Sequence, residues 1–454
     1  MPQMEAREEA QPSRAVSGWT VGLVCVAIVA SGVIVGGLLH EPEPALTTKP
    51  VPTATATPSR PRAENSYVTP AVVFPVEIPG CAVVEPPTEG NLMAWASYGT
   101  FGYDNPAYPW FSGPKAVAMS RALRDGLPDD VEVAFASDEQ SLLFQPILDD
   151  PEDADSPPGA GGWTTASGTL RRGAGEGGLM VTVRQSAAPV PACVAGDLDE
   201  RRRLADGTTV DVQDTWYEID KVRTLSRTAR AYLPDGTAVT TAATDQRSDG
   251  SGHSGTVPLT VDELAALATA PGLRVTTPVP PGTPDVPESC SGATETGGLI
   301  DEGVTRRLDA VLAHIPLDGL TLDRPLGQLR PTGPSASGVC QAVRITTPGR
   351  ESRLSVAIAT EQRLPEDTPP NRDGDRVTNR RLPDGTVVET RESRYTVQSQ
   401  KPGAQPVPET MRTVAVTRPS GTRVHVSSTA ADPIEPLPFA QLEAIATNPD
   451  LEVR

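Results

Sequence analysis

The sequence is poor in the residue types that most often fill a core or carry chemistry. Its 454 residues include only five Trp, seven Tyr, six Phe, four His and five Cys, whereas Pro occurs 48 times. So few aromatic residues and so many prolines predict that much of the chain is loop or linker. The length allows two or three domains.

The scarce histidines and cysteines do not form a recognisable metal or catalytic motif. There is no C-x-x-C and no H-E-x-x-H, and the loop around Ser254 lacks the G-x-S-x-G order of a nucleophile elbow. No histidine has a Glu or Cys at metal spacing. We therefore predict no metal, no cofactor and no catalytic residue, and we expect that the protein is not an enzyme. The four histidines are His40, His253, His314 and His425.

Two stretches match ligand motifs only in part. Residues 173–178 fit G-x-G-x-x-G but precede the β-branched run Met180–Val183, so they predict a hairpin loop rather than a dinucleotide site. Residues 149–155 read DDPEDAD but lack the Gly and the final Glu of an EF-hand. A solvated acidic loop is the better interpretation.

Basic residues are also in the minority. Only four are lysine, and the formal net charge is −19. Such a balance argues against binding nucleic acid or anionic polymers, because the chain would repel both. The preference for Arg, together with many Ala, Gly, Pro, Thr and Val residues, is typical of a GC-rich bacterial genome.

One long apolar run, Trp19–Leu39, has no charge and no Pro. At about 1.5 Å per residue a helix of this length crosses a bilayer core of about 30 Å. Arg7 and Arg14 precede it, so the tail 1–18 is predicted to be cytoplasmic and the bulk of the chain extracytoplasmic. The alternative is a cleaved signal peptide, but the run is long and lacks a clean Ala-x-Ala site.

Gly32 and Gly36 within this run form a GxxxG motif, which would let two membrane helices approach closely. A homodimer through this motif is therefore possible. Residues 40–76 are rich in Pro, Thr and Ala and predict an extended linker that reaches about 110 Å.

Beyond the linker the chain repeats itself. Residues 258–275 and 436–453 are identical at nine of 18 positions, at an offset of 178. The same offset relates R-R-L-A-D-G-T at 202–208 to R-R-L-P-D-G-T at 380–386, and weaker echoes join 234–237 with 419–422 and Leu127-Pro128 with Ile315-Pro316. Several echoes in one order indicate a duplication. The predicted modules are 77–275 and 290–454, joined by a Pro-rich hinge at 276–289.

Each module has the pattern of an α+β fold. In the first, we expect a helix over 114–125, capped by Ser112, and a short closing helix with a capping box from Thr260 to Glu263. Val- and Thr-rich runs predict an antiparallel sheet between these helices, with Asp-Gly turns at 206–207 and 235–236. The runs are 131–136, 179–185, 208–217, 221–233 and 237–243. In the second module the first helix is expected over 301–315.

Four cysteines lie outside the membrane segment, two in each module. Outside a bacterial membrane disulfides persist, and four cysteines allow three pairings. Because modules usually close on themselves, we predict Cys81 with Cys193 and Cys290 with Cys340.

The aromatic residues are concentrated in one stretch of the first module, which has no counterpart in the second. One interpretation is that this stretch folds over the module and completes its core. The other is an aromatic-lined surface for a ligand or partner. The residues concerned are Trp95, Tyr98, Phe101, Tyr103, Asp104, Tyr108, Trp110 and Phe111.

The duplicated hairpins and the shared L-x-x-x-x-L-x-A-x-A-T-x-P-x-L-x-V endings resemble uncharacterised exported or single-pass membrane proteins of actinobacteria. These motifs are structural, so the resemblance implies no catalytic residue. We expect a membrane-anchored binding or scaffolding protein of the cell envelope that contacts an envelope protein or polymer. The alternative is a regulatory or sensor membrane protein of the anti-sigma-partner type, although 18 cytoplasmic residues are too few for a domain. An envelope hydrolase has the least support.

Overall fold

The computed structural model describes residues 67–87, 102–148, 162–247, 252–290, 297–317, 319–333, 338–347, 350–365, 376–397 and 406–453. The predicted membrane segment 19–39, with Gly32 and Gly36, and most of the linker lie outside these residues. Within them, none of the helices has the length and apolar character that a membrane crossing requires.

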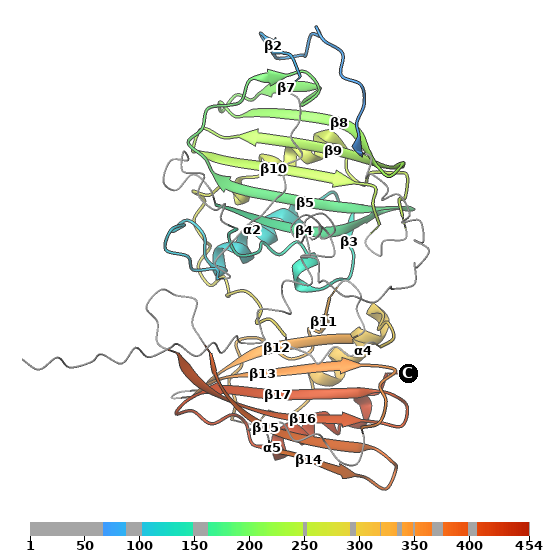
Figure 1. Ribbon diagram of the computed structural model, residues 1–454. Coiled ribbons are helices and arrows are strands. Elements are labelled where there is room, and N and C mark those ends of the chain that lie inside the picture. The colour runs from blue at the N-terminus through green and yellow to red at the C-terminus, as the bar shows by residue number, and fades with distance from the viewer. Residues whose placement is uncertain are drawn as a thin grey trace, which may run out of the picture. The chain divides into compact units, whose positions relative to one another are not determined.

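The first module contains one large antiparallel sheet (Figure 1). Its strands are β1 (Tyr67–Val68), β3 (Glu132–Val133), β4 (Trp163–Arg172), β5 (Gly175–Gln185), β7 (Glu200–Arg203), β8 (Thr209–Ile219), β9 (Val222–Tyr232) and β10 (Thr237–Thr244). Their order is β3, β4, β5, β10, β9, β8, β1, and β7 also pairs with β8. The predicted antiparallel arrangement is therefore confirmed.

Tight glycine turns set the register of these hairpins. Gly207 and Gly236 have φ angles of 88° and 81°, a region that favours glycine because it has no Cβ. Asp206 and Asp235 each accept a hydrogen bond from the backbone N–H two residues on. Gly173 and Ala174 form the turn of the predicted hairpin between β4 and β5, since Arg172 pairs with Gly175 and the other glycines of the run lie in β5.

Two helices pack on one face of the first sheet. In α2 (Gly113–Asp125), Ser112 caps the N-terminus as predicted. In α3 (Val261–Ala268), Thr260 and Glu263 form the predicted capping box, and η2 (Pro271–Leu273) follows. The core lies between these helices and the sheet. Its largest fully buried side chains include Phe144, Met119, Leu123, Leu179, Leu264 and Leu267.

The second module repeats this order of elements. Its strands are β11 (Arg330–Pro331), β12 (Gly338–Thr347), β13 (Arg350–Ala359), β14 (Arg376–Arg381), β15 (Val387–Val397), β16 (Val407–Thr417) and β17 (Arg423–Ala431). They are arranged as β11, β12, β13, β17, β16, β15, β14. This is the order β3, β4, β5, β10, β9, β8, β7 of the first module, so the duplication seen in the sequence extends to the sheet topology.

The first helix of the second module begins where the sequence indicates but ends at Leu312, three residues before the predicted Ile315. Asp301 caps α4 (Glu302–Leu312), while α5 (Phe439–Ala446) and η3 (Pro449–Leu451) correspond to α3 and η2. Helix α5 has Pro438 at the N-cap position and no side-chain cap, so the capping box of the first module is not retained. A separate core lies beneath these helices and includes Leu308, Val343, Val356, Val426 and Leu442.

Both predicted disulfides are present. Cys81 is bonded to Cys193 and Cys290 to Cys340, with Cα–Cα distances of 6.2 and 6.0 Å. The first holds a small lobe in which β2 (Val84–Glu85) and β6 (Cys193–Val194) pair in parallel around buried Ile78 and Leu198.

Two local expectations need correction. The linker predicted to end at residue 76 includes β1, which pairs with β8 because Tyr67 stacks on Tyr217 at 6.1 Å. In the strand predicted over 208–217, alternation of apolar and polar residues would place Asp211 at an exposed position, but Asp211 is buried on the face away from the helices. A buried ion pair with Arg201 on β7 explains this exception.

Candidate functional site

The described part of the aromatic stretch contributes to the core of the first module. Tyr108 and Phe111 are buried, Tyr103 and Trp110 pack against them, and Asp104 is exposed. The ring centroid of Phe111 lies 6.0 Å from that of Tyr103 and 5.3 Å from that of Trp110. The predicted residues Trp95, Tyr98 and Phe101 lie outside the described residues.

Two polar groups show that this aromatic cluster is shielded from solvent. Burial, and to a lesser degree the nearby Asp138 and Asp285, raises the pKa of the Tyr103 hydroxyl well above its usual value. The indole Nε1 of Trp110 is buried without a hydrogen-bond partner. The described rings are therefore placed as the core interpretation expects.

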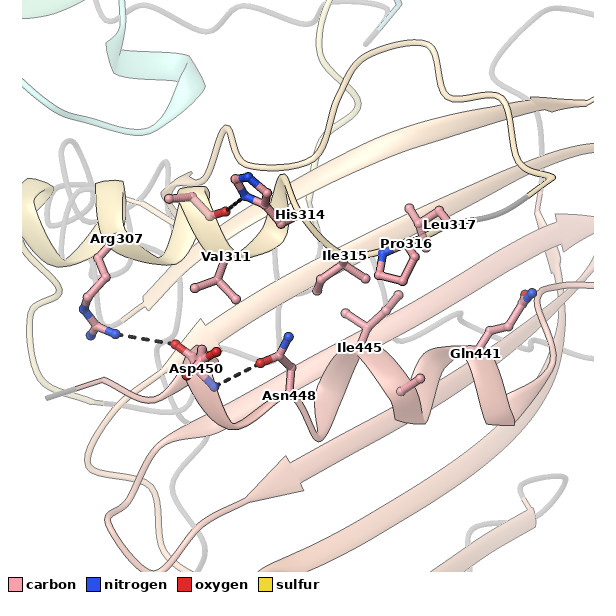
Figure 2. Close-up of a pocket in the computed structure, with 12 residues that line it drawn as sticks. Arg307, Val311, His314, Ile315, Pro316, Leu317, Gln441, Ile445, Asn448 and Asp450 are labelled. Carbon is pink, nitrogen blue, oxygen red and sulfur yellow. Dashed lines mark hydrogen bonds between the residues drawn. The ribbon is translucent and has the colours of Figure 1, made fainter.

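A groove of about 700 Å³ lies in the second module between α4 and α5 (Figure 2). Val311 and Ile315 extend from the α4 side, and Ile445 lies opposite on α5. Its apolar lining consists of Ala310, Val311, Ile315, Pro316, Leu317, Ala444 and Ile445, and its polar edge of Arg307, His314, Gln441, Asn448 and Asp450. Ala310, Pro316 and Ala444 are the exposed members of the apolar lining. No Trp, Tyr or Phe is among these lining residues.

At the corresponding place of the first module, small residues allow a close contact between the helices. A Cβ added to Gly272 would lie 2.3 Å from the Cβ of Ala122, and one added to Gly126 would lie 3.0 Å from Leu267. Helix α2 therefore approaches α3 and η2 at van der Waals distance.

The two echoes of the sequence identify the corresponding residues in the second module. The offset of 188 places His314 where the first module has Gly126, and the offset of 178 places Asp450 where it has Gly272. Two glycines at a close helix contact are thus replaced by larger polar residues. His314 and Asp450 both line the groove.

Hydrogen bonds to backbone groups fix the residues of the polar edge. Arg307 donates to the carbonyl oxygen of Glu452 at 2.8 Å and to that of Asp450 at 3.5 Å. The ring Nδ1 of His314 lies 2.6 Å from the carbonyl oxygen of Ala310, and Asn448 accepts from the backbone N–H of Asp450 at 3.0 Å. Figure 2 shows the hydrogen bonds of Arg307 and Asn448 with Asp450 and that of His314 with Ala310.

A cation serves the same backbone position in both modules, but from different sites on the first helix. In the first module buried Lys115 donates to the carbonyl oxygen of Arg274, which corresponds to Glu452. Burial lowers the pKa of Lys115 to about 8, although Asp235 opposes the shift. In the second module the cation is the exposed Arg307, one helical turn further on. The groove therefore has a positive charge at its surface that the first module keeps inside.

The groove has the features of a binding surface: an apolar lining, hydrogen-bonding groups at its edge and a fixed position between two helices. Within the described part of the chain, His, Cys, Asp and Glu residues do not cluster in a way that could hold a metal ion. The sequence analysis missed this site. The signal was the replacement of Gly126 and Gly272 by His314 and Asp450 between the repeats.

No family model matches the chain, and no curated protein shows significant similarity to it. Among solved structures, the crystal structure of the di-domain ARO/CYC StfQ from the steffimycin biosynthetic pathway has 10% sequence identity and a TM-score of 0.12. The match covers 74% of this chain and 85% of the other. At that TM-score the likeness supports neither a shared fold nor a shared activity.

Proposed function

We propose that the protein is a membrane-anchored extracytoplasmic binding or scaffolding protein of the bacterial cell envelope, and that the groove between α4 and α5 is its partner site. The observation that carries the proposal is the difference between the repeats. The same helix contact is closed in the first module and open, apolar and polar-edged in the second.

The two disulfides support the location outside the cytoplasm. Disulfides persist where no reducing system removes them, which in bacteria means beyond the cell membrane. The apolar run at 19–39 supplies the anchor in this proposal.

The occupant we propose for the groove is the apolar face of a polypeptide segment from an envelope protein. A groove between two helices suits a segment whose apolar side chains recur on one face, as in helix-in-groove recognition. The lining contains no Trp, Tyr or Phe on which a sugar ring would stack. Gln441, His314 and Arg307 lie at the edge, where they would meet polar groups of the same segment.

Site-directed crosslinking in the producing cells would test the site. A photoreactive phenylalanine in place of Gln441, on the exposed edge, should form an adduct with one polypeptide. The substitution Ala444→Trp, which fills the groove from its exposed side, should reduce that adduct at least ten-fold. The matched control is Ala266→Trp, which adds the same ring at the corresponding exposed position of α3.

Peptide mapping of the adduct must place the crosslink on an amphipathic segment. An adduct that persists in the Ala444→Trp variant, or that is lost equally in the Ala266→Trp variant, would refute the groove as the partner site.

The anchoring is tested separately. Reporter fusions that fluoresce only in the cytosol should be dark when fused after Thr69, and the protein should resist carbonate extraction. A soluble mature protein beginning near Glu41 would show that the segment is a cleaved signal peptide.

A further inference from the structure

Strand β15 of the second module leaves part of one edge unpaired. Strand β14 pairs with it only as far as Glu392, and among the described residues no strand continues along the same edge over Arg394–Val397. All four of these residues are exposed, Tyr395 by 37% and Val397 by 38%. A strand that is paired on one side only presents unpaired backbone N–H and C=O groups, on which another strand can add.

The backbone of Thr396 points out of this edge. Thr396 lies opposite Pro408 on β16, and the carbonyl oxygen of Pro408 accepts a hydrogen bond from the N–H of Asp432 at 3.0 Å. In an antiparallel pair, opposite residues either exchange both hydrogen bonds or direct their backbone groups away from each other. Because Pro408 directs its carbonyl to Asp432 and has no N–H, Thr396 directs its N–H and C=O to the open edge. Arg394, two residues earlier, does the same.

In the first module the corresponding edge is occupied. The offset of 178 relates β15 to β8 residue by residue, so Thr396 corresponds to Glu218. Strand β1 adds to that edge, with Val68 opposite Glu218. Residues 216–218 are half-buried there, whereas residues 394–396 are exposed in the second module. The chain itself therefore shows that this edge accepts a short extended segment.

The aromatic contact of β1 also has its counterpart in the second module. Tyr67 lies opposite Ile219, and its ring stacks on the diagonal neighbour Tyr217 with 6.1 Å between the centroids. Tyr395 corresponds to Tyr217, and Val397 corresponds to Ile219. An aromatic residue opposite Val397 would therefore lie beside the exposed ring of Tyr395 in the same way.

Cations outnumber carboxylates on the helix side of this edge. Glu392 forms an ion pair with Arg412 at 2.8 Å, and Arg412 also pairs with Glu435 and lies over a ring of α5. Arg376 lies opposite Glu392, and Arg394 follows on the same side of β15. The hydrogen bond from Arg412 is the main cause of the lowered pKa of Glu392, and the charges of Arg394 and Arg376 add to it. Three arginines thus share two carboxylates, and among the described residues Arg394 has no hydrogen bond or salt bridge. The first module has an uncharged tryptophan at its place.

We propose that the edge of β15 at Arg394–Val397 binds an extended segment of a partner polypeptide by strand addition, with an aromatic residue beside Tyr395 and an acidic residue beside Arg394. In the register of β1 the aromatic residue lies opposite Val397, and the residue three positions later lies opposite Arg394. The acidic residue belongs on the helix side, because Glu409 already lies opposite Tyr395 on the other face. The recognised pattern is therefore aromatic-x-x-acid. None of the residues that line the groove lies on β15, so the two sites are separate.

The test uses the full-length chain in micelles of an uncharged detergent. The probe is a dye-labelled peptide with the sequence of residues 65–71 and the change Pro70→Glu, which gives the proposed pattern. Fluorescence anisotropy should show saturable binding, weakened about ten-fold by Tyr395→Ala in the protein and about three-fold by Arg394→Gln at low salt. The control is Arg184→Gln, which removes an exposed arginine from a strand of the first module and should leave the Kd unchanged.

Changes in the peptide test the strand pairing without altering the protein. N-methylation at the position of Val68 blocks the N–H that would bond to the carbonyl of Thr396, so it should weaken binding about ten-fold. N-methylation at the position of Thr69 blocks an N–H that points away from β15, and it should be tolerated.

Absence of saturable binding, or equal effects of the two methylated peptides, would overturn the proposal. So would a dimer in sedimentation experiments that Tyr395→Ala abolishes, because a second copy would then occupy the edge. Equal weakening of the Kd by the two arginine variants would show that no acidic residue is bound beside Arg394. Ala444→Trp should leave peptide binding intact, so failure of this edge and failure of the groove are distinguishable.

Discussion

At the scale of single residues, one ion pair and two single side chains show three ways in which this protein buries polar groups. Arg201 and Asp211 form a bidentate ion pair at 2.6 and 2.7 Å, with side chains 8% and 7% exposed. Trp110 buries a donor without an acceptor, and His425 buries a nitrogen without a partner. Each of the three leads to a different stability effect on substitution.

The ion pair is best tested by a double-mutant cycle. Asp211→Ala should destabilise the first module by about 3–5 kcal/mol, because it leaves the Arg201 guanidinium buried and unpaired. The double variant Arg201→Met with Asp211→Leu should recover most of this loss, since no charge then remains in the apolar site. Urea denaturation gives the free energies of unfolding. Equal losses in the single and the double variant would contradict this account.

Two substitutions of Trp110 distinguish the effect of losing the packed ring from the effect of losing the indole N–H. Trp110→Ala removes a ring packed against Phe111 and should cost about 3–5 kcal/mol. Trp110→Phe retains a ring and removes the unpartnered indole N–H, so it should cost less than about 1.5 kcal/mol. Thermal melting of both variants measures the difference. Similar losses for the two would mean that the indole donor does have a partner.

His425 should make the second module sensitive to acid. Its folded-state pKa of about 4 lies below the ordinary value of 6.5. Between these two pH values the imidazole of His425 is therefore protonated in the unfolded chain and neutral in the folded chain. The free energy of unfolding therefore falls as pH decreases from 6.5 to 4, by about 1.4 kcal/mol per pH unit from this group. His425→Asn should lose that part of the slope. Parallel pH profiles for the two proteins would refute the prediction.

At the scale of elements, the contact between the first helix and the closing helix is where the modules diverge. In both, a cation from the first helix binds the carbonyl at the end of the short 3₁₀ turn, from Lys115 or from Arg307. The elements themselves were predictable, because capping residues, Asp-Gly turns and Val- or Thr-rich runs are local signals. Strand β4 was not predicted, since its Ser, Gly and Thr residues lack apolar alternation.

This difference between the modules predicts that a substitution by alanine is destabilising at Gly272 but tolerated at the corresponding Asp450. Gly272→Ala should destabilise the first module by about 1–3 kcal/mol, because the new methyl group meets the Cβ of Ala122. Asp450→Ala, at the matching exposed position, should stay within about 0.5 kcal/mol of the parent. Denaturation in guanidinium chloride compares the two. If both substitutions prove neutral, the close contact in the first module yields more readily than its geometry indicates.

At the scale of the whole molecule, two disulfides constrain the unfolded chain. They join residues 112 and 50 positions apart. In the chain-entropy model, loops of these lengths give stabilisations of about 5 and about 4 kcal/mol. The sequence supplied the pairing through a simple physical expectation, that each module closes on itself.

Replacing Cys81 and Cys193 by serine should therefore lower the free energy of unfolding more than replacing Cys290 and Cys340. Cys81→Ser with Cys193→Ser should also detach the small lobe around Ile78, because its core holds few other apolar residues. Calorimetric melting would measure the stability, and limited proteolysis near β2 would report the lobe. A larger loss from the Cys290 and Cys340 pair would contradict the loop-length argument.

The sequence by itself determined the duplication, the antiparallel α+β modules, the helix caps and the cysteine pairing. All of these depend on signals within a few residues or on comparison of one repeat with the other. Only the tertiary structure decided the rest. Whether Gly272 and Asp450 close or open a groove depends on a neighbouring helix far away in the sequence, as does the burial of Asp211 beside Arg201. The position of His425 between Ala357 and Ala415 likewise depends on how three strands align, and a linear pattern does not record that register.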